Sequence, residues 1–255
     1  SQDPETKVIL MYIEAIDDGK KFIEVAKKVT KLKSVIGLKA GRTAAGSKAV
    51  ISHTGALSGA FSIYKGAFSQ AGIISADTVQ ELVDIGKAFS YQPYAKGNRI
   101  AIITGGGGYG VIASDSCETM GLQVASLGDE TIKNMRMSFP PHYVVKNPVD
   151  LTGDASEGDY KTALALTLED QNVDGVIMII LFQVPRLKET IVDAISETTC
   201  RLHDKPVIIS SIGGEHTKKM VGKLEARKIP VYPTPERAVK VMAALVEYGK
   251  YTSET

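Results

Sequence analysis

The sequence predicts an α/β protein built on two doubly wound parallel sheets. Short apolar segments of strand length alternate with longer amphipathic segments of helix length along the whole chain, which is the order of β-α-β units. Glycine-rich turns follow several of the predicted strands, as is common where a parallel strand leads into a helix. With 255 residues, 44% hydrophobic and 23% charged, the chain is long enough for two modest domains.

The first domain is predicted to cover residues 1–96. Its elements in order are strand 7–13, helix 19–32, strand 34–39, helix 59–70, strand 72–74 and helix 76–89. The strands are short and apolar, whereas the helices are longer and amphipathic. Three strands are too few to complete a doubly wound sheet, so we expect this domain to be incomplete and to begin upstream of Ser1.

The second domain is predicted to cover residues 97–255, after a seam of turn-forming residues at 90–98. Its elements are strand 99–104, helix 109–120, strand 123–125, helix 129–137, helix 157–169, strand 175–181, helix 187–200, strand 206–210, helix 215–227, strand 230–232 and helix 235–248. A proline-rich stretch at 139–152 is expected to be irregular. Five strands with helices between them predict a complete flavodoxin-like domain.

The composition argues against several classes of protein. A net charge of +1, 6% aromatic residues and no tryptophan argue against nucleic-acid binding. No apolar run has the length of a membrane span, and the first residues lack the order of a signal peptide. We therefore expect a cytoplasmic protein with no membrane partner. The two cysteines, Cys117 and Cys200, are too few for a disulfide framework or a zinc cluster, and no metal site is predicted.

One histidine lies in a segment rich in glycine and small residues. His53 falls within residues 41–59, which we interpret as a loop between a strand and a helix. A neutral imidazole is nucleophilic near pH 7, and Ser52, Thr54 and Gly55 leave room for a phosphate and offer hydroxyl and backbone donors. The segment predicts a phosphoryl-carrying loop, although a loop histidine often has no chemical role.

Glu14 is the second candidate in the first domain, because it follows an apolar strand. If the first two strands are adjacent and parallel, their carboxyl ends bring Glu14 and His53 to one edge of the sheet. A carboxylate bonded to one ring nitrogen would fix the tautomer while the other nitrogen takes a phosphoryl group. The alternative is a solvated glutamate at a strand end. Lys39 and Arg42 flank the histidine segment and could meet a phosphate there.

A glycine-rich turn follows the first strand of the second domain. It leads directly into a helix, so backbone amides and the helix N-terminus could approach an anion. The turn lacks the Lys and Ser/Thr of a P-loop, and a tight turn without a ligand is the alternative. The candidate phosphate-binding residues are Gly105, Gly106, Gly107, Gly108, Tyr109 and Gly110.

Other polar positions in the second domain are weaker candidates. The glycine pair 213–214 follows a later strand and would lie at the same edge of the sheet. Asn147 and Asp150 flank Pro148 and could either cap the backbone or touch a substrate. The remaining histidines lack the surroundings of His53 and are set aside, namely His142, His203 and His216.

Five stretches of the chain are similar, in order, to those of a known family. They lie at residues 8–19, 37–43, 52–59, 147–155 and 230–238. The third reads Ser-His-Thr-Gly-Ala-Leu-Ser-Gly and the fourth Asn-Pro-Val-Asp-Leu-Thr-Gly-Asp-Ala. On these residues the sequence resembles the NDP-forming acyl-CoA synthetases. Within them it resembles the α subunits of ADP-forming acetate–CoA ligases, which are relatives of succinyl-CoA synthetase.

The resemblance implies a succinyl-CoA synthetase-like fold and an acid–thiol ligase reaction, acyl-CoA + ADP + phosphate = acid + CoA + ATP. It implies that His53 is phosphorylated, that Glu14 hydrogen-bonds it and that the glycine turn opens a helix pointed at the phosphate. CoA and ADP or ATP with Mg2+ would be substrates of the full enzyme, bound mainly outside this chain. The implied partners are an ATP-grasp subunit or domain, an upstream CoA-binding domain and a small carboxylic acid, in a hetero-oligomer or dimer.

Two departures from the family pattern leave alternatives open. The family's N-terminal CoA-binding domain and its Ser-x-Ser-Gly turn are not in this sequence, so the resemblance implies a fragment that is inactive alone. The glycine turn reads Thr-Gly-Gly-Gly-Gly-Tyr-Gly in place of Thr-Asn-Ala-Gly-Gly-Pro-Gly. The alternatives are a non-catalytic or regulatory synthetase-like module, a flavin-binding domain, and a docking module for an ATP-grasp subunit. The presence of both His53 and Glu14 favours the enzyme.

Overall fold

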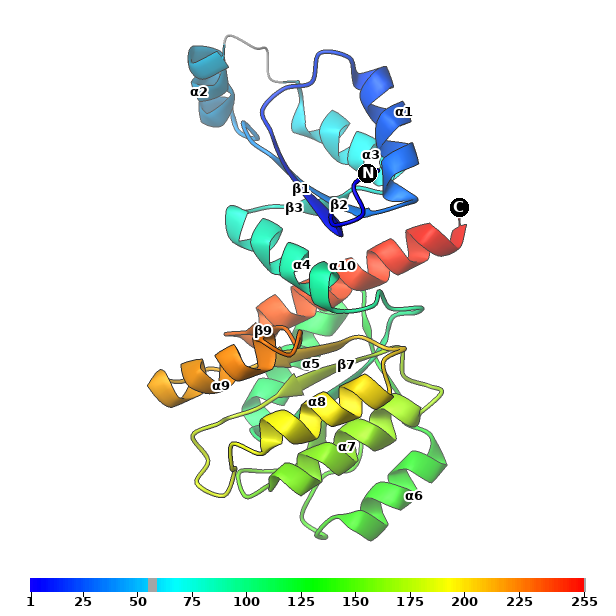
Figure 1. Cartoon of the computed structure of the whole chain (residues 1–255), viewed down its shortest axis with the longest axis vertical. Helices are drawn as coiled ribbons and strands as arrows, with labels where there is room; N and C mark the ends of the chain where they lie inside the picture. Colours follow the sequence, from blue (N-terminus) through cyan, green and yellow to red (C-terminus); the bar gives the residue numbers. More distant parts are fainter. Residues whose placement is uncertain (55–58, 255) are drawn as a thin grey trace. The chain divides into compact units, whose positions relative to one another are not determined.

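The computed structural model describes residues 1–54 and 59–254, and these divide into two compact units (Figure 1). Unit 1 is Ser1–Ser90 together with the chain end from Lys250, and unit 2 is Tyr91–Gly249. Each unit contains its own parallel sheet. The α/β class with two parallel sheets, predicted from the alternation of strands and helices, is confirmed.

Unit 1 is built on a sheet of three parallel strands in the order β1-β2-β3. The strands are β1 (Val8–Ile13), β2 (Ser34–Lys39) and β3 (Ile74–Ala76), and the helices are α1 (Gly19–Thr30), α2 (Ala44–Thr54), α3 (Phe61–Ala71) and α4 (Val79–Tyr91). The first two strands are adjacent and parallel, which was the condition set for bringing Glu14 and His53 to one edge, with Ile13 opposite Lys39 at their carboxyl ends. This register places the residues that follow β1 and β2 at the same edge of the sheet.

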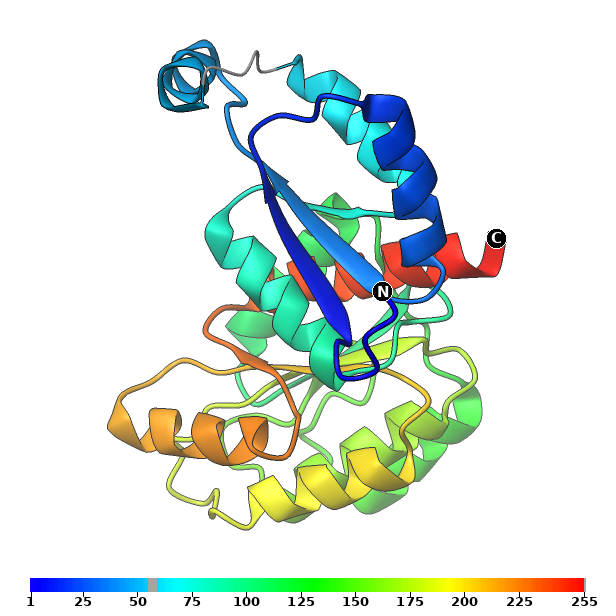
Figure 2. The ribbon, with the colours of Figure 1, turned by 45° about the horizontal axis from the view of Figure 1, so that its top comes forward.

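The core of unit 1 lies between the sheet and helices α1 and α3, which Figure 2 shows side by side. Phe68 of α3 packs on β2 at Gly37, where a Cβ atom would lie 2.6 Å from the ring. Glycine is needed there because any side chain would displace the aromatic ring. On the other face of the sheet, Leu10 of β1 contacts α4 at Gly86.

Helix α2 corrects the prediction that residues 41–59 form one loop. Residues 44–54 are helical, and the hydroxyl of Thr43 accepts a hydrogen bond from the amide of Gly46 (3.1 Å) at the start of the helix. Three alanines and this cap favour a helix, and these local preferences outweigh the small residues that suggested a loop. Gly55 lies outside the described residues, as does the side chain of Thr54.

Unit 2 is built on parallel strands in the order β5-β4-β7-β8-β9, which is the flavodoxin-like order predicted. The strands are β4 (Arg99–Thr104), β5 (Gln123–Val124), β6 (Val149–Asp150), β7 (Gly175–Ile179), β8 (Val207–Ser210) and β9 (Val231–Tyr232). The short β6 pairs with β4 off this path, so the stretch expected to be irregular contributes a sixth strand.

Helices cover both faces of the unit 2 sheet. They are α5 (Gly107–Thr119), α6 (Asp129–Ser138), α7 (Glu157–Glu169), α8 (Ile191–Arg201), α9 (Glu215–Glu225) and α10 (Pro235–Glu254). Helices α6 to α9 form a row on one face, and Met242 of α10 packs on Gly175 at the other (Figure 1). Because both faces are covered, β7 and residues 100–103 of β4 carry no polar side chain. None of the described helices is both long and apolar enough to span a bilayer.

Candidate functional site

A groove in unit 1 brings the two predicted catalytic residues to the same cavity. It has a volume of about 780 Å³ and is lined by residues 10–17, by Phe22 of α1 and by His53 of α2. The chain from the end of β1 therefore forms one wall, and the carboxyl end of α2 contributes the imidazole. Glu14 and His53 thus line one groove beyond the carboxyl end of β1, and their roles stay predictions.

Glu14 directly follows β1 and has one unsatisfied oxygen. Its Oε1 accepts a hydrogen bond from the hydroxyl of Tyr12 (3.3 Å). Its Oε2 is buried and has no hydrogen-bond partner among the described residues. A buried carboxylate oxygen without a donor is costly, so such atoms are concentrated where a further group is to be bound. Partial desolvation, followed by the charge of the same carboxylate and the hydrogen bond to it, raises the pKa of Tyr12.

His53 lies in the last turn of α2 and is exposed. Within the described residues no hydrogen bond joins its ring to Glu14. The carboxyl end of a helix carries partial negative charge, which favours a positively charged side chain over an anion. In this arrangement the imidazole is accessible to a reactant, and the contact with Glu14 that the resemblance implies is not formed.

Arg42 and Lys39 are both held by other groups of the protein. The Arg42 guanidinium pairs with the carboxylate of Asp77 (2.7 Å), donates to its carbonyl (3.0 Å) and stacks on the ring of Phe61 (4.1 Å). Lys39 is only 1% exposed, and its Nζ contacts the carbonyl of Ala40. Protein groups thus already hold both side chains in this arrangement, and their approach to a phosphate stays a prediction.

The glycine turn of unit 2 forms the start of α5, as predicted. Gly106 is the N-cap, and its amide donates to the hydroxyl of Thr104 (3.0 Å). A Cβ on Gly105 would overlap the hydroxyl of buried Tyr160, and one on Gly107 would lie 2.6 Å from Asp150 Oδ2. Gly105 and Gly107 thus have a packing reason, and a carboxylate already lies near the helix N-terminus where an anion is predicted to bind.

The turn that contains Asn147 is held by the backbone. The Asn147 side chain donates to the carbonyls of Ile100 (2.8 Å) and Ala125 (2.9 Å) and accepts from the amide of Ile102 (2.8 Å). Asn147 could either cap the backbone or touch a substrate, and these hydrogen bonds support the structural role. Nearby Thr152 adopts a positive φ of 56°, which is unusual for a β-branched residue and was not predicted.

The other candidates fall outside the groove of unit 1. His142 pairs with Asp154 (3.3 Å) at the surface, and His203 lies 3.9 Å from Asp204. The glycine pair 213–214 follows β8 and precedes α9, at the carboxyl edge of the sheet. The Thr217 hydroxyl lies so close to Gly213 that there is no space for a side chain at that position.

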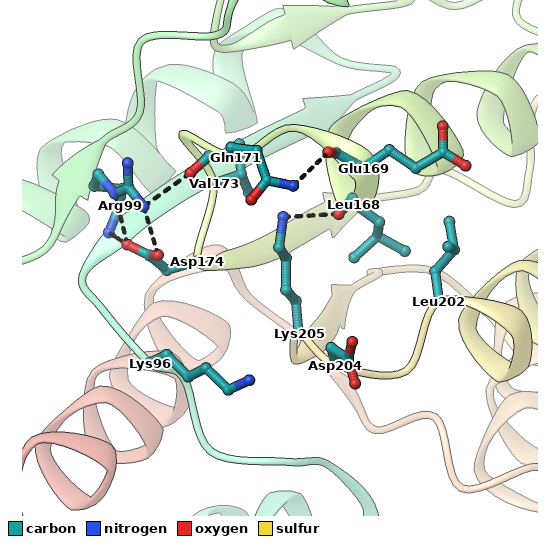
Figure 3. Close-up of a pocket in the computed structure, with 10 residues that line it drawn as sticks. All are labelled: Lys96, Arg99, Leu168, Glu169, Gln171, Val173, Asp174, Leu202, Asp204 and Lys205. Atoms are coloured by element: carbon teal, nitrogen blue, oxygen red, sulfur yellow. Dashed lines mark hydrogen bonds and ion pairs between the residues drawn. The ribbon is translucent and has the colours of Figure 1, made fainter. Parts of the chain in front are cut away.

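A charged network at the amino ends of the unit 2 strands was not predicted from the sequence. A cavity of about 450 Å³ is lined by residues that include Arg99, Asp174 and Lys205. Figure 3 shows Arg99 bonded to Asp174, and Lys205 bonded to the carbonyl of Leu168 beside them. Lys205 donates to the carbonyls of Leu168 (2.7 Å) and Asp170 (2.6 Å) at the end of α7. Burial lowers the pKa of Lys205, while the two aspartates act in the opposite direction.

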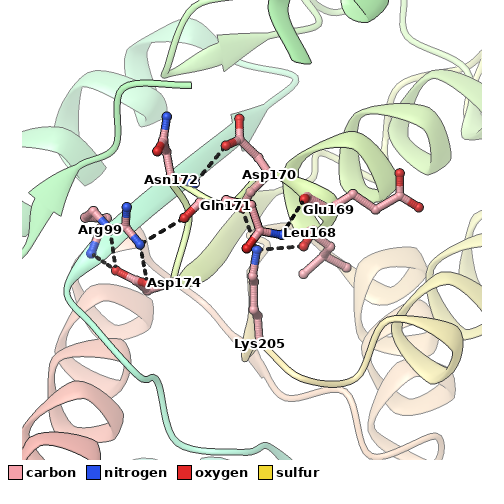
Figure 4. A network of polar contacts seen from close by, with 8 residues as sticks. All are labelled: Arg99, Leu168, Glu169, Asp170, Gln171, Asn172, Asp174 and Lys205. Carbon is pink, nitrogen blue, oxygen red and sulfur yellow. Dashed lines mark hydrogen bonds and ion pairs between the residues drawn. The ribbon is translucent and has the colours of Figure 1, made fainter. Parts of the chain in front are cut away.

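The same network supplies hydrogen-bond partners to the backbone of the loop between α7 and β7 (Figure 4). The Asp170 carboxylate accepts from the amides of Gly128 and Asn172 (both 2.8 Å). Burial would raise the pKa of Asp170, but these hydrogen bonds and the nearby Lys205 lower it overall. Since the charged groups bond to one another and to helix and loop backbone, we interpret this region as stabilising the fold.

The comparisons with known proteins match one family domain to each of the two units. Residues 1–89 match the family described as succinyl-CoA ligase like flavodoxin domain, and residues 100–254 match the Ligase-CoA domain. On these two domains the chain falls in the class of CoA ligases. The chain belongs to the NDP-forming acyl-CoA synthetase family, as the motifs indicated.

Individual relatives are similar along almost the whole chain. The α subunit of ADP-forming acetate–CoA ligase II from Pyrococcus furiosus is 42% identical over 96% of this chain and 54% of its own length. A 4-hydroxybutyrate–CoA ligase (ADP-forming) from Nitrosopumilus maritimus is 31% identical over 98% of this chain and 36% of its own.

A solved structure shows the same fold. The dinucleotide-forming acetyl-coenzyme A synthetase 1 of Candidatus Korarchaeum cryptofilum, in complex with phosphate and ADP, has a TM-score of 0.92 at 33% identity. The match covers 99% of this chain and 56% of that one. The chain thus spans about half the length of the first relatives that it matches.

Proposed function

We propose that this chain is part of an ADP-forming acyl-CoA synthetase and carries its phosphohistidine. The names of the relatives support the reaction acyl-CoA + ADP + phosphate = acid + CoA + ATP. The observation that carries the proposal is that Glu14 and His53 line one groove, with a buried and unsatisfied oxygen on the glutamate.

The proposed reaction consists of three displacements. Phosphate attacks the thioester carbonyl, the C–S bond breaks, and CoA leaves as the acyl phosphate forms. A nitrogen of His53 then attacks phosphorus, and the acid leaves as its carboxylate. Finally, a β-phosphate oxygen of ADP attacks the phosphohistidine, which yields ATP and the free imidazole. Each step needs positioned donors and cations, which lower the cost of transferring a charged group.

Glu14 is proposed to steady the imidazole during the second step. When one ring nitrogen takes the phosphoryl group, the other carries its proton, and a carboxylate that accepts this hydrogen stabilises the positive charge. This contact needs a movement of α2 or of the turn after β1. A phosphoryl group also adds negative charge at the carboxyl end of α2, so phosphorylation is expected to loosen its last turn.

The neighbours of His53 and the glycine turn have proposed supporting roles. Ser52, Thr54 and Gly55 would offer donors around the phosphohistidine. The turn at Gly105–Gly110, with Tyr109, would offer amides to phosphate when a cation or a movement offsets the charge of Asp150. This role is less direct than that of His53 because the carboxylate faces the same helix end.

Substrates and partners complete the proposal. CoA, ADP or ATP with Mg2+, and a small carboxylic acid are the proposed substrates, bound mainly by an ATP-grasp subunit or domain and by a CoA-binding domain. Mg2+ would offset phosphate charge at the nucleotide. We propose a cytoplasmic hetero-oligomer or dimer in which this chain is inactive alone.

Isotope exchange between ADP and ATP in the complete enzyme tests this function. Exchange needs the phosphohistidine but neither CoA nor the acid. His53→Ala should reduce exchange on the order of 10³-fold or more, because the carrier of the covalent intermediate is lost. His142→Ala, which removes a surface histidine of unit 2, should leave exchange unchanged. Full exchange in His53→Ala would refute the proposal.

A further inference from the structure

Lys39 is a charged side chain that the proposed reaction does not use and that the fold buries almost completely. It is the last residue of β2, lies opposite Ile13 of β1 and is 1% exposed. The amide of Ala40 donates to the carbonyl of Ile13 (2.9 Å), which fixes the two strand ends together. Because burying an ammonium group is costly, the surrounding groups must compensate its charge.

Three kinds of group offset the charge of Lys39. Its Nζ contacts the carbonyl of Ala40 and lies 4.6 Å from the centre of the Tyr64 ring. Burial lowers the pKa of Lys39, and the negative charge of Glu14 counteracts that shift. The Tyr64 hydroxyl accepts from the amide of Ile16 (3.0 Å), so the same ring holds the chain just after Glu14.

We propose that Lys39 is a positioning residue that orients Glu14 for its contact with His53, and this rests on the function proposed above. The buried ammonium lies at the end of β2, opposite the residue that precedes Glu14, so it attracts the carboxylate and restricts how it can turn. Tyr64 holds the backbone of the 14–16 turn against the same site. Glu14 therefore has a preferred direction when the imidazole approaches, which lowers the cost of forming the hydrogen bond.

A direct role for Lys39 as a phosphate ligand fits the structure less well. A residue that is 1% exposed cannot reach a phosphate in the groove without leaving the carbonyl of Ala40 and the ring of Tyr64. Its effect on the reaction must then pass through Glu14. Removing Lys39 should slow phosphoryl transfer only in an enzyme that still has the Glu14 carboxylate.

The experiment measures the single-turnover rate constant and amplitude of His53 phosphorylation from ATP and Mg2+ in the complete enzyme. Lys39→Met removes the charge and keeps an apolar chain of similar length, and we expect a rate constant about 10- to 100-fold lower at unchanged amplitude. In the Glu14→Gln enzyme, adding Lys39→Met should change the rate less than twofold. Lys48→Met, a loss of charge on the exposed face of α2, is the matched control.

The pH profile separates positioning from a structural role. Loss of the positive charge should move the acid limb of the rate profile of Lys39→Met to higher pH, whereas misfolding would lower only the amplitude. Lys39→Gln replaces Lys39→Met if the latter folds poorly. Two results would overturn this inference and leave the proposed function standing. One is a wild-type rate constant in Lys39→Met, and the other is an equal effect of Lys39→Met with and without the Glu14 carboxylate. If wild-type His53 is not phosphorylated, the proposed function falls and this inference with it.

Discussion

The pairing of Arg99 with Asp174 should be one of the stronger polar contributions to the stability of unit 2. The Asp174 carboxylate accepts from the backbone amide (3.0 Å), Nε (2.8 Å) and Nη2 (2.8 Å) of Arg99. Arg99 also donates to the carbonyl of Gln171 (3.0 Å). This contact joins the start of β4 to the start of β7, the two central strands. Asp174→Asn keeps the shape of the side chain and removes its charge.

The expected cost follows from the hydrogen bonds lost and from the exposure of each partner. A hydrogen bond to a charged group contributes about 1.5–3 kcal/mol. The Asp174 side chain is 12% exposed, but that of Arg99 is 41% exposed, so water can replace part of what the guanidinium loses. An asparagine can still accept one bond. We therefore expect a loss of about 2 kcal/mol, or about 4–8 °C in Tm, for a unit of this size.

The effect should depend on pH with a defined sign. Burial would raise the pKa of Asp174, but hydrogen bonds and charge from Arg99 outweigh it and lower the pKa overall. A depressed folded-state pKa contributes stability that is present above the unfolded value and is lost as pH falls through the folded value. The difference between wild type and Asp174→Asn should be full at pH 6–7 and should shrink below about pH 4.

Urea unfolding monitored by circular dichroism, with hydrogen exchange of the peptide containing β4, measures this loss in unit 2. Asp204→Asn is the matched control, since this carboxylate lines the same cavity but is 84% exposed. Its expected cost is below about 0.5 kcal/mol. Equal effects of the two variants, or a cost for Asp174→Asn that persists undiminished at pH 3, would refute the reasoning.

Two further predictions concern packing and thiol reactivity. Gly105→Ala should destabilise unit 2 by about 1–3 kcal/mol, because its Cβ overlaps the Tyr160 hydroxyl, and Tyr160→Phe should relieve part of this cost. Gly108→Ala, with open space around the new atom, should be neutral or stabilising in the same thermal melts. Iodoacetamide at pH 8 should modify exposed Cys200 and spare Cys117, since burial raises the pKa of that thiol to about 11; equal alkylation in mass spectra would contradict this.

Elements with strong local patterns were predicted from the sequence with the bounds that the structure has. Strands 34–39 and 99–104 are short, apolar and followed by turns, and helix 157–169 begins after a capping box formed by Ser156 and Asp159. In these segments propensity, hydrophobic pattern and termination all favour one structure. The parallel order of strands then followed from the general topology of α/β folds.

Helix α2 and the partner of Arg42 were not predicted, the first for a local reason and the second because it depends on a long-range contact. Helix α2 has little hydrophobic periodicity, and its glycine and serine residues suggested a loop, although alanines and the Thr43 cap favour a helix. The partner of Arg42 is Asp77, which is distant in sequence and meets it only through the β2–β3 pairing. An arginine beside a glycine-rich segment can indicate phosphate binding, but the packing of the fold determines whether its N–H groups already bond to protein groups.

Localising a phosphoryl group in the complete enzyme tests the central claim most directly. After incubation with ATP and Mg2+ and digestion with trypsin under alkaline conditions, the peptide 49–65 carries His53, and the peptide 137–146 carries His142. We predict one acid-labile phosphate on the first peptide, confined to His53 by tandem mass spectrometry and discharged by ADP. An enzyme that makes ATP while this peptide stays unmodified, or that carries the label on another residue, would contradict the account.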